Sequence, residues 1–297
     1  MAQQLLNLKS TSYEHPFDKA ALEAMRKLPL FQSAMGFLLN WGSIKWRVIE
    51  LCGNNFHVTK ASCPELYNLV QSVADTLDVD RMPLVYTQWC YGINAYTTGT
   101  PEEALLLIYT GAVDLLTDPE LTYIVGHEMG HIKSGHVIYH VMANMISEIL
   151  REMGILGRAG MPLQLALGHW SRMAEFTADR AGLLAVQDLD AALSAIMKMA
   201  GIPKRYFNIA NPHIFAEQAE EFLHDYGDTA NTIIRNVSIL DDSHPWTVLR
   251  AAELIKWVNE GGYQAILDGA RGIECPRCHY YIDEGRTTCP ICGNTEF

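Results

Sequence analysis

One short stretch of the chain combines residue types that can bind a metal ion and activate water. His127 and His131 are four residues apart, and Glu128 directly follows the first histidine. On a helix, residues four apart project from the same face, so both imidazoles can reach one zinc ion. Glu128 can lie beside the open coordination position, where a general base for metal-activated water must sit. The spacing predicts a catalytic zinc site, with two surface histidines on a helix as the alternative.

A catalytic zinc site needs a third protein ligand from another part of the chain. The extended metzincin motif does not supply it, because Gly135 and His136 are each one residue out of register. A glutamate on a later helix can supply it, and Glu175 precedes Asp179 by one helical turn. We expect Glu175 to bind zinc and Asp179 to accept a hydrogen bond from the distal nitrogen of a ligand histidine. An exposed Glu175, with Asp179 paired to a nearby base, is the alternative.

Four of the 7 cysteines form two close pairs near the end of the chain, Cys275 with Cys278 and Cys289 with Cys292. Two such pairs can wrap one metal ion, and four thiolates complete a tetrahedral site that leaves no place for water. The pattern resembles a small zinc ribbon with a structural role, since so short a segment could hardly fold without its metal. Iron in a rubredoxin-like site and two disulfides are the alternatives.

The elements that must position these residues can be read from the periodicity of apolar residues. Short segments rich in branched and aromatic residues predict strands at 83–87, 93–97 and 105–109. Amphipathic periods predict helices at 16–29, 64–77, 119–136, 137–153, 171–188, 191–200, 214–224 and 247–260. The metal-binding motif lies on the helix that opens with Thr117-Asp118-Pro119-Glu120, a capping sequence followed by proline in the first turn. This order of elements predicts an α+β fold that is mostly helical.

The composition bounds the class of protein. Of the 297 residues, 49% are hydrophobic, and 22 basic residues stand against 34 acidic ones for a net charge of -12. A large core can form, whereas binding of nucleic acid through a broad basic face is excluded. We expect no secretory signal, no membrane span and a cytoplasmic protein. The apolar segment 161–170 is expected to be a buried helix or a lid on the core, with peripheral contact to a membrane surface as the alternative.

Four separated segments carry motifs that occur together in one family. They are Asn94-Ala95-Tyr96, residues 127–136, residues 175–179, and Ser243-His244-Pro245 with Arg250 downstream. In this order they resemble the HtpX-like and CAAX-prenyl-protease group of gluzincin zinc metallopeptidases, over about residues 13–259. The resemblance implies a zinc endopeptidase with His127, His131 and Glu175 as zinc ligands and Glu128 as general base and acid.

The resemblance also implies roles for two other motifs. His244 would donate a hydrogen bond to the oxyanion, with a loop or helix-capping histidine as the alternative. Asn94, Ala95 and Tyr96 would form a strand at the edge of the cleft, which pairs with an extended peptide or protein substrate. Well-known members of the group surround the catalytic core with membrane-spanning helices. No such helix is expected in this chain, and this departure from the group argues against a membrane-embedded or prenylated substrate.

The expected organisation is a gluzincin peptidase domain, residues 1–268, followed by a zinc ribbon, residues 269–297, with one catalytic and one structural zinc ion. The ribbon could dock a protein partner. Two other functions stay open: a peptide-binding or chaperone-like protein that cleaves weakly or not at all, and a zinc hydrolase whose substrate is not a peptide.

Overall fold

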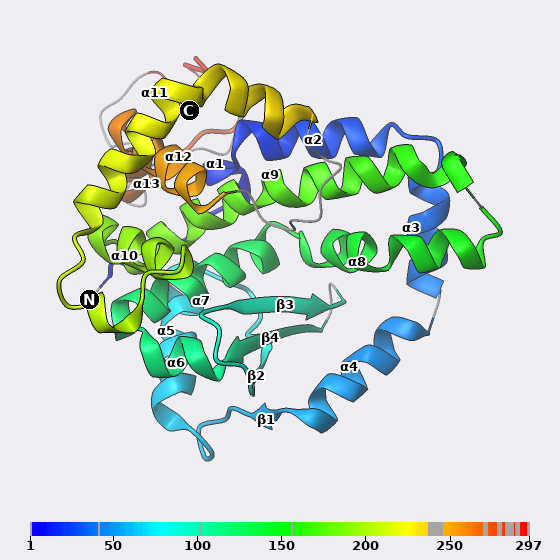
Figure 1. Cartoon of the computed structure of the whole chain (residues 1–297), viewed down its shortest axis with the longest axis horizontal. Helices are drawn as coiled ribbons and strands as arrows, with labels where there is room; N and C mark the ends of the chain where they lie inside the picture. Colours follow the sequence, from blue (N-terminus) through cyan, green and yellow to red (C-terminus); the bar gives the residue numbers. More distant parts are fainter. Residues whose placement is uncertain are drawn as a thin grey trace.

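In the computed structural model, helices surround one small sheet (Figure 1). The structure describes residues 2–40, 42–100, 103–155, 157–236, 246–269, 273–277, 281–282, 288 and 292–295. The helices are α1 (Ser10–Tyr13), α2 (Pro16–Arg26), α3 (Phe31–Asn40), α4 (Ser43–Asn54), α5 (Pro64–Thr76), α6 (Thr110–Leu115), α7 (Asp118–Lys133), α8 (Val137–Glu152), α9 (Met161–Val186), α10 (Leu189–Met199), α11 (Pro212–Asn236), α12 (Thr247–Asn259) and α13 (Gly262–Gly269). Short 3₁₀ turns cover Gly157–Gly160 and Lys204–Tyr206. The predicted α+β class is confirmed.

The sheet has the strand order β1-β2-β4-β3. Its strands are β1 (Phe56–His57), β2 (Leu84–Gln88), β3 (Ala95–Gly99) and β4 (Ala104–Tyr109). β2 and β4 are parallel, whereas β1 and β3 pair antiparallel with their neighbours. The three predicted strands are confirmed to within two residues. β3 is an edge strand, and it lies on the side of the sheet that faces α8 (Figure 1).

Helix α7 begins and ends where local sequence signals require. Glu120 accepts a hydrogen bond from the backbone N–H of Thr117 at 2.8 Å, which forms a capping box at the first turn. The helix ends at Lys133 and not at His136 as predicted, because Gly135 adopts a left-handed conformation with φ of 69°. The backbone N–H of His136 then bonds the carbonyl of His131 at 2.9 Å. This turn places His136 beside the metal-binding motif.

Helices α7 and α9 pack closely because small residues face each other along their contact. A Cβ atom at Gly126 would lie 2.4 Å from the Cβ of Ala185, and one at Gly130 would lie 2.5 Å from the Cβ of Ala181. Real Cβ atoms do not approach so closely, so only glycine fits at both positions. The close approach brings the middle of α9 against the histidine-bearing face of α7.

Helix α9 is longer than predicted and runs through both large hydrophobic cores. It begins at Met161, ten residues before the predicted start, and it includes the apolar segment 161–170. Leu163, Leu167 and Trp170 of this segment are buried against α2, α3 and α8, as the buried-helix interpretation expects. The second half of α9 packs in the other core, against α5, α7, α10 and α12. Among the described residues, no helix combines the length and the apolar character needed to cross a membrane.

Helices α3 and α4 were not predicted from the sequence. α4 lies across the outer face of the sheet, where Leu51 packs with Tyr86, Leu105 and Leu107. Near the end of the chain, β5 (Ile273–Glu274) and β6 (Tyr281–Ile282) form a short antiparallel pair.

Candidate active site

The structure brings His127, His131 and Glu175 together at one buried point between α7 and α9. The Nε2 atoms of the two histidines are 3.2 Å apart. One Glu175 carboxylate oxygen, Oε2, lies 3.4 Å from the His127 nitrogen, and the other, Oε1, lies 3.4 Å from the His131 nitrogen. In a tetrahedral zinc site with bonds of about 2.0–2.1 Å, ligand atoms are about 3.3–3.4 Å apart. The donor types and spacings therefore fit a zinc ion.

The two candidate ligand histidines differ in their electrostatic surroundings. Burial lowers the pKa of His131 to about 4, which favours the neutral ring, whereas burial at His127 is outweighed by hydrogen bonds to Asp179 and Glu175, which raise its pKa to about 9. A metal ion binds the neutral ring through its free nitrogen lone pair.

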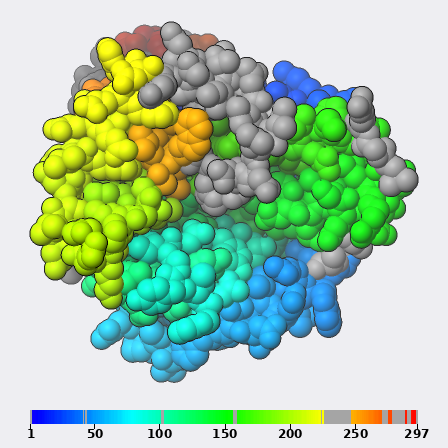
Figure 2. All heavy atoms as spheres, in the orientation of Figure 1, coloured from blue at the N-terminus to red at the C-terminus, as the bar shows by residue number. Residues whose placement is uncertain are grey.

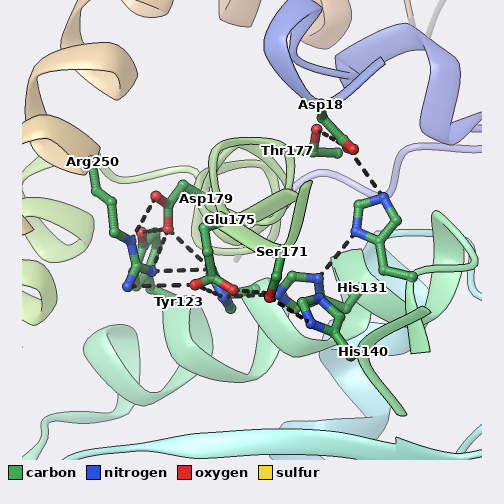
Figure 3. Close-up of polar contacts among 11 residues, drawn as sticks. Asp18, Tyr123, His131, His140, Ser171, Glu175, Thr177, Asp179 and Arg250 are labelled. Carbon is green, nitrogen blue, oxygen red and sulfur yellow. Dashed lines mark hydrogen bonds and ion pairs between the residues drawn. The ribbon is translucent and has the colours of Figure 1, made fainter. Parts of the chain in front are cut away.

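A carboxylate stands directly behind His127. Asp179, one turn after Glu175 on α9, lies 3.0 Å from the Nδ1 atom of His127 through its Oδ1 atom. Arg250 on α12 donates to both Asp179 oxygens, at 2.9 Å and 2.6 Å, and its guanidinium also lies 3.7 Å from the Glu175 carboxylate. Figure 3 shows Arg250 at one end of this row of contacts, with Asp179 between it and Glu175.

The charge of Asp179 is held by these neighbours. Burial alone would raise the pKa of its carboxyl, but the Arg250 guanidinium outweighs burial and holds the pKa well below its usual range. Tyr123 adds a third donor, because its hydroxyl bonds Asp179 at 2.7 Å. The sequence analysis did not select Tyr123, although its place four residues before His127 puts both on one face of the helix.

A different arrangement stands behind His131, and the sequence analysis missed it. The Nδ1 atom of His131 lies 3.1 Å from the Nδ1 atom of His136. The Nε2 atom of His136 lies 3.1 Å from a carboxylate oxygen of Asp18 on α2. Thr177 and Trp170 of α9 donate to the same carboxylate, at 2.7 Å and 2.9 Å. Figure 3 shows Asp18 at the opposite end of the row from Arg250.

Two of the candidate zinc ligands, His131 and Glu175, open onto a cleft of about 580 Å³. Its walls come from α4, from residues 94–98 on and before β3, and from α8, and Glu128, His131 and Glu175 lie on its lining. In Figure 2 the surface is hollowed between the blue and cyan segments and the green helices.

Burial raises the pKa of Glu128 to about 7, against the opposing influence of His127 and of a hydrogen bond with the Thr97 side chain.

Strand β3 turns part of its backbone toward the free edge. Tyr109 donates its N–H to the carbonyl of Asn94 at 3.0 Å, which marks a hydrogen-bonded pair of the β3–β4 ladder. Hydrogen-bonded pairs alternate along an antiparallel ladder, so Tyr96 is the next one and the N–H and carbonyl groups of Ala95 and Thr97 point away from β4. These groups are available to an extended chain in the cleft.

The structure describes only some of the remaining candidate residues. Cys275 and Cys292 lie together, with 3.7 Å between their Sγ atoms. Cys278, Cys289 and His244 lie outside the described residues.

Comparison with known proteins identifies the family. Peptidase family M48 matches residues 61–258. The chain is 29% identical over 266 residues to a plastoglobule-localized metallopeptidase 48, chloroplastic, of Arabidopsis thaliana, covering 89% of this chain and 77% of that protein. It is 30% identical over 266 residues to a protease HtpX homolog of Ralstonia pickettii (strain 12J), covering 80% of this chain and 88% of that protein. No solved structure matches the chain. The chain belongs to peptidase family M48 and is an HtpX-like zinc metallopeptidase.

Proposed function

We propose that this metallopeptidase is an endopeptidase that holds its zinc ion through His127, His131 and Glu175 and uses Glu128 as general base and acid. The observation that carries the proposal is the convergence of two imidazole nitrogens, 3.2 Å apart, and the Glu175 carboxylate, whose oxygens lie 3.4 Å from them, beside a cleft that His131, Glu175, Glu128 and β3 line. A non-cleaving relative would not need the ligands, the acid and the edge strand together.

The bound zinc would supply Lewis-acid chemistry, lowering the pKa of a water molecule and polarising the scissile carbonyl. Glu128 takes the proton of the attacking water on its carboxylate and gives it to the leaving amine. Asp179 accepts a hydrogen bond from the His127 Nδ1–H, which leaves Nε2 free to bind the metal. Arg250 holds Asp179 in place from its far side.

The test of this assignment is the substitution Glu128→Gln. The variant should keep one zinc ion at this site, because the three ligands remain, and lose peptide cleavage by about 100-fold or more, because the base is gone. Asp118→Asn, on the exposed first turn of the same helix, is the matched control and should keep both zinc and activity. Full cleavage by the Glu128→Gln protein would contradict the role of Glu128.

We further propose that the substrate is an extended peptide or protein segment that adds a strand to β3 at Asn94, Ala95 and Tyr96. The outward backbone groups of Ala95 and Thr97 support this pairing. Thr97→Pro removes one outward N–H without removing a ladder bond to β4. Its kcat/KM for a long peptide should be about 10-fold lower than that of Thr97→Val, because one backbone hydrogen bond to the substrate is lost. Equal values for the two variants would contradict strand addition.

We propose that His244 donates a hydrogen bond to the oxyanion that forms during cleavage. The support is its place six residues before Arg250, which lies in the site. His244→Ala should lower kcat by about 100-fold or more, with little change in KM, since this bond forms only in the transition state. An unchanged kcat would assign His244 to the loop or capping role.

We propose a second domain, residues 269–297, built as a zinc ribbon on Cys275, Cys278, Cys289 and Cys292. The 3.7 Å between the Sγ atoms of Cys275 and Cys292 supports the proposal, because four thiolates around zinc at about 2.3 Å stand about 3.75 Å apart. The ribbon would stabilise the end of the chain and could dock a protein partner.

A cytoplasmic location stays a prediction, and the plastoglobule and chloroplast location in the name of the Arabidopsis relative belongs to that protein.

A further inference from the structure

We propose that His136 and Asp18 are positioning residues for His131, so that the N-terminal helix α2 forms part of the support of the metal centre. The inference rests on the proposed role of His131 as a zinc ligand. It extends the metal centre to a helix that lies outside residues 61–258, the part of the chain that matches the family.

Metal binding through the Nε2 atom of His131, together with the hydrogen-bond geometry, would fix one tautomer at each step. The Nε2 atom of His131 faces His127 and Glu175, so its lone pair is the one that can bind a metal. Its proton must then be on Nδ1, and that proton can be given to the Nδ1 atom of His136 at 3.1 Å. His136 consequently carries its own proton on Nε2, which lies 3.1 Å from Asp18. The carboxylate of Asp18 therefore selects, through His136, the metal-binding tautomer of His131.

Asp18 is itself held in one orientation. It is fully buried, at 0% exposure, and it receives hydrogen bonds from the Trp170 indole at 2.9 Å and the Thr177 hydroxyl at 2.7 Å. Thr177 is two residues after the ligand Glu175 on α9. The same helix thus supplies one metal ligand and holds the carboxylate that supports another, which is a rigid basis for orienting His131.

A purely structural tie between α2 and α9 is the competing explanation. Asp18 lies in the first turn of α2, where an acidic side chain stabilises a helix. A structural tie predicts that variants lose stability and keep zinc affinity. A positioning role predicts that they lose zinc affinity even when they stay folded.

The experiment compares Asp18→Asn, His136→Leu and His136→Gln with the wild type. For each full-length protein, we would measure the zinc dissociation constant by chelator competition, the visible spectrum of the cobalt-substituted form, and the thermal midpoint of the metal-free form. Asp18→Asn and His136→Leu should bind zinc about 10-fold or more weakly and shift the cobalt spectrum. His136→Gln can still accept and donate a hydrogen bond, so it should recover part of the affinity.

Glu120→Gln is the matched control, because it also replaces a buried, hydrogen-bonded carboxylate with an amide. Glu120 lies on α7 itself and bonds Ser194 and Lys198, without contact to the metal ligands. This variant should lose stability and keep the wild-type zinc affinity. If Asp18→Asn does not fold, Thr177→Val removes one donor to the same carboxylate and should still lower zinc affinity by a few-fold.

Two outcomes separate this inference from the proposed function. If His131→Ala loses zinc while the folded Asp18 and His136 variants keep the wild-type dissociation constant and cobalt spectrum, the positioning role is wrong and the proposed function stands. If His131→Ala keeps the catalytic zinc, the proposed ligand set is wrong and the inference falls with it.

Discussion

The two histidines of the candidate zinc site are supported by different kinds of neighbours. Behind His127 stands one carboxylate, Asp179, paired with the Arg250 guanidinium at 2.6 Å. Behind His131 stands a second histidine, and behind that the carboxylate of Asp18, which also accepts bonds from an indole and a hydroxyl. The first support joins α9 to α12, and the second joins the turn between α7 and α8 to α2 and α9 (Figure 1).

One site therefore orients two histidines, both proposed zinc ligands, in two different ways. The His127 support balances a buried negative charge with a full positive charge. The His131 support uses contacts from an imidazole, an indole and a hydroxyl to the Asp18 carboxylate, over a longer path. Loss of one member of a buried ion pair leaves an uncompensated charge, so the His127 support should be the more sensitive to substitution.

The largest effect is therefore expected from Asp179→Asn. The substitution leaves the Arg250 charge buried without its carboxylate, and the free energy of unfolding of the metal-free protein should fall by about 3–5 kcal/mol. Urea denaturation measures this loss. The double variant Asp179→Asn, Arg250→Met should recover part of it, since no buried charge is then left over. A smaller loss of unfolding free energy for Asp179→Asn than for Asp18→Asn would contradict the greater sensitivity of the His127 support.

The ion pair between Glu120 and Lys198 lies at the first turn of α7, the helix that carries His127 and His131. It tests whether a buried charge pair stabilises this helix away from the candidate zinc site. Burial alone would raise the pKa of Glu120, but the 2.6 Å bond from Lys198 and the bond from Ser194 outweigh it and lower the pKa. Its contribution is complete above the ordinary glutamate pKa of 4.5 and is lost as the pH falls through the lowered value.

The wild type should thus exceed Glu120→Gln in unfolding free energy by about 1.5–3 kcal/mol near pH 7. The two curves should converge as the pH is lowered below 4.5 and through the lowered pKa, because the wild-type carboxyl then becomes protonated. Denaturant unfolding across this pH range measures the difference. A gap that does not change with pH would show that the ion pair is not its source.

Gly130→Ala should weaken both supports at once, because it forces α7 away from α9. The added methyl would meet the Cβ of Ala181 at 2.5 Å, and overpacking of this kind costs about 1–3 kcal/mol. Zinc affinity should fall together with stability. Gly36→Ala is the matched control, since nothing lies within 4 Å of a Cβ there and the helix should gain about 0.5–1 kcal/mol. Equal effects of both substitutions would contradict the close α7–α9 contact.

The smallest effects are expected from removing one hydroxyl on each side. Tyr123→Phe removes a donor to Asp179, and Thr177→Val removes a donor to Asp18 together with the acceptor of the His15 backbone N–H. The unfolding free energy should fall by about 1 kcal/mol for Tyr123→Phe and by about 1–2 kcal/mol for Thr177→Val, where a buried N–H also loses its partner. Zinc affinity should fall more for Thr177→Val, because Arg250 still holds Asp179 through two bonds. A larger loss of zinc affinity for Tyr123→Phe would contradict this ranking.

The sequence predicted those parts of the molecule whose signals are local. The capping box at Thr117 and the branched segments of the sheet are written in neighbouring residues, and both were found in place. The grouping of His127, His131 and Glu175 followed from two short motifs and the spacing on a helix.

The parts of the site that were not predicted depend on contacts between residues far apart in the chain. Asp18 and His136 are separated by 118 positions, so no periodicity connects them. From the sequence, His136 was an out-of-register residue of another zinc motif and part of the segment 127–136 that resembles the family, whereas the left-handed turn at Gly135 places it beside the Nδ1 atom of His131. The glycines of α7 gave a signal that was not used: Gly126 and Gly130 are four apart, and Ala181 and Ala185 repeat the same spacing on α9.

Glu175 is proposed to complete a catalytic zinc site that is separate from the cysteine site. Mass spectrometry of the metal content per chain in the wild type, Glu175→Ala and Cys275→Ser proteins tests this proposal. Two zinc ions in the wild type should fall to one in each variant, with cleavage lost in Glu175→Ala. A Glu175→Ala protein that still holds two zinc ions and cleaves peptides would contradict the claim.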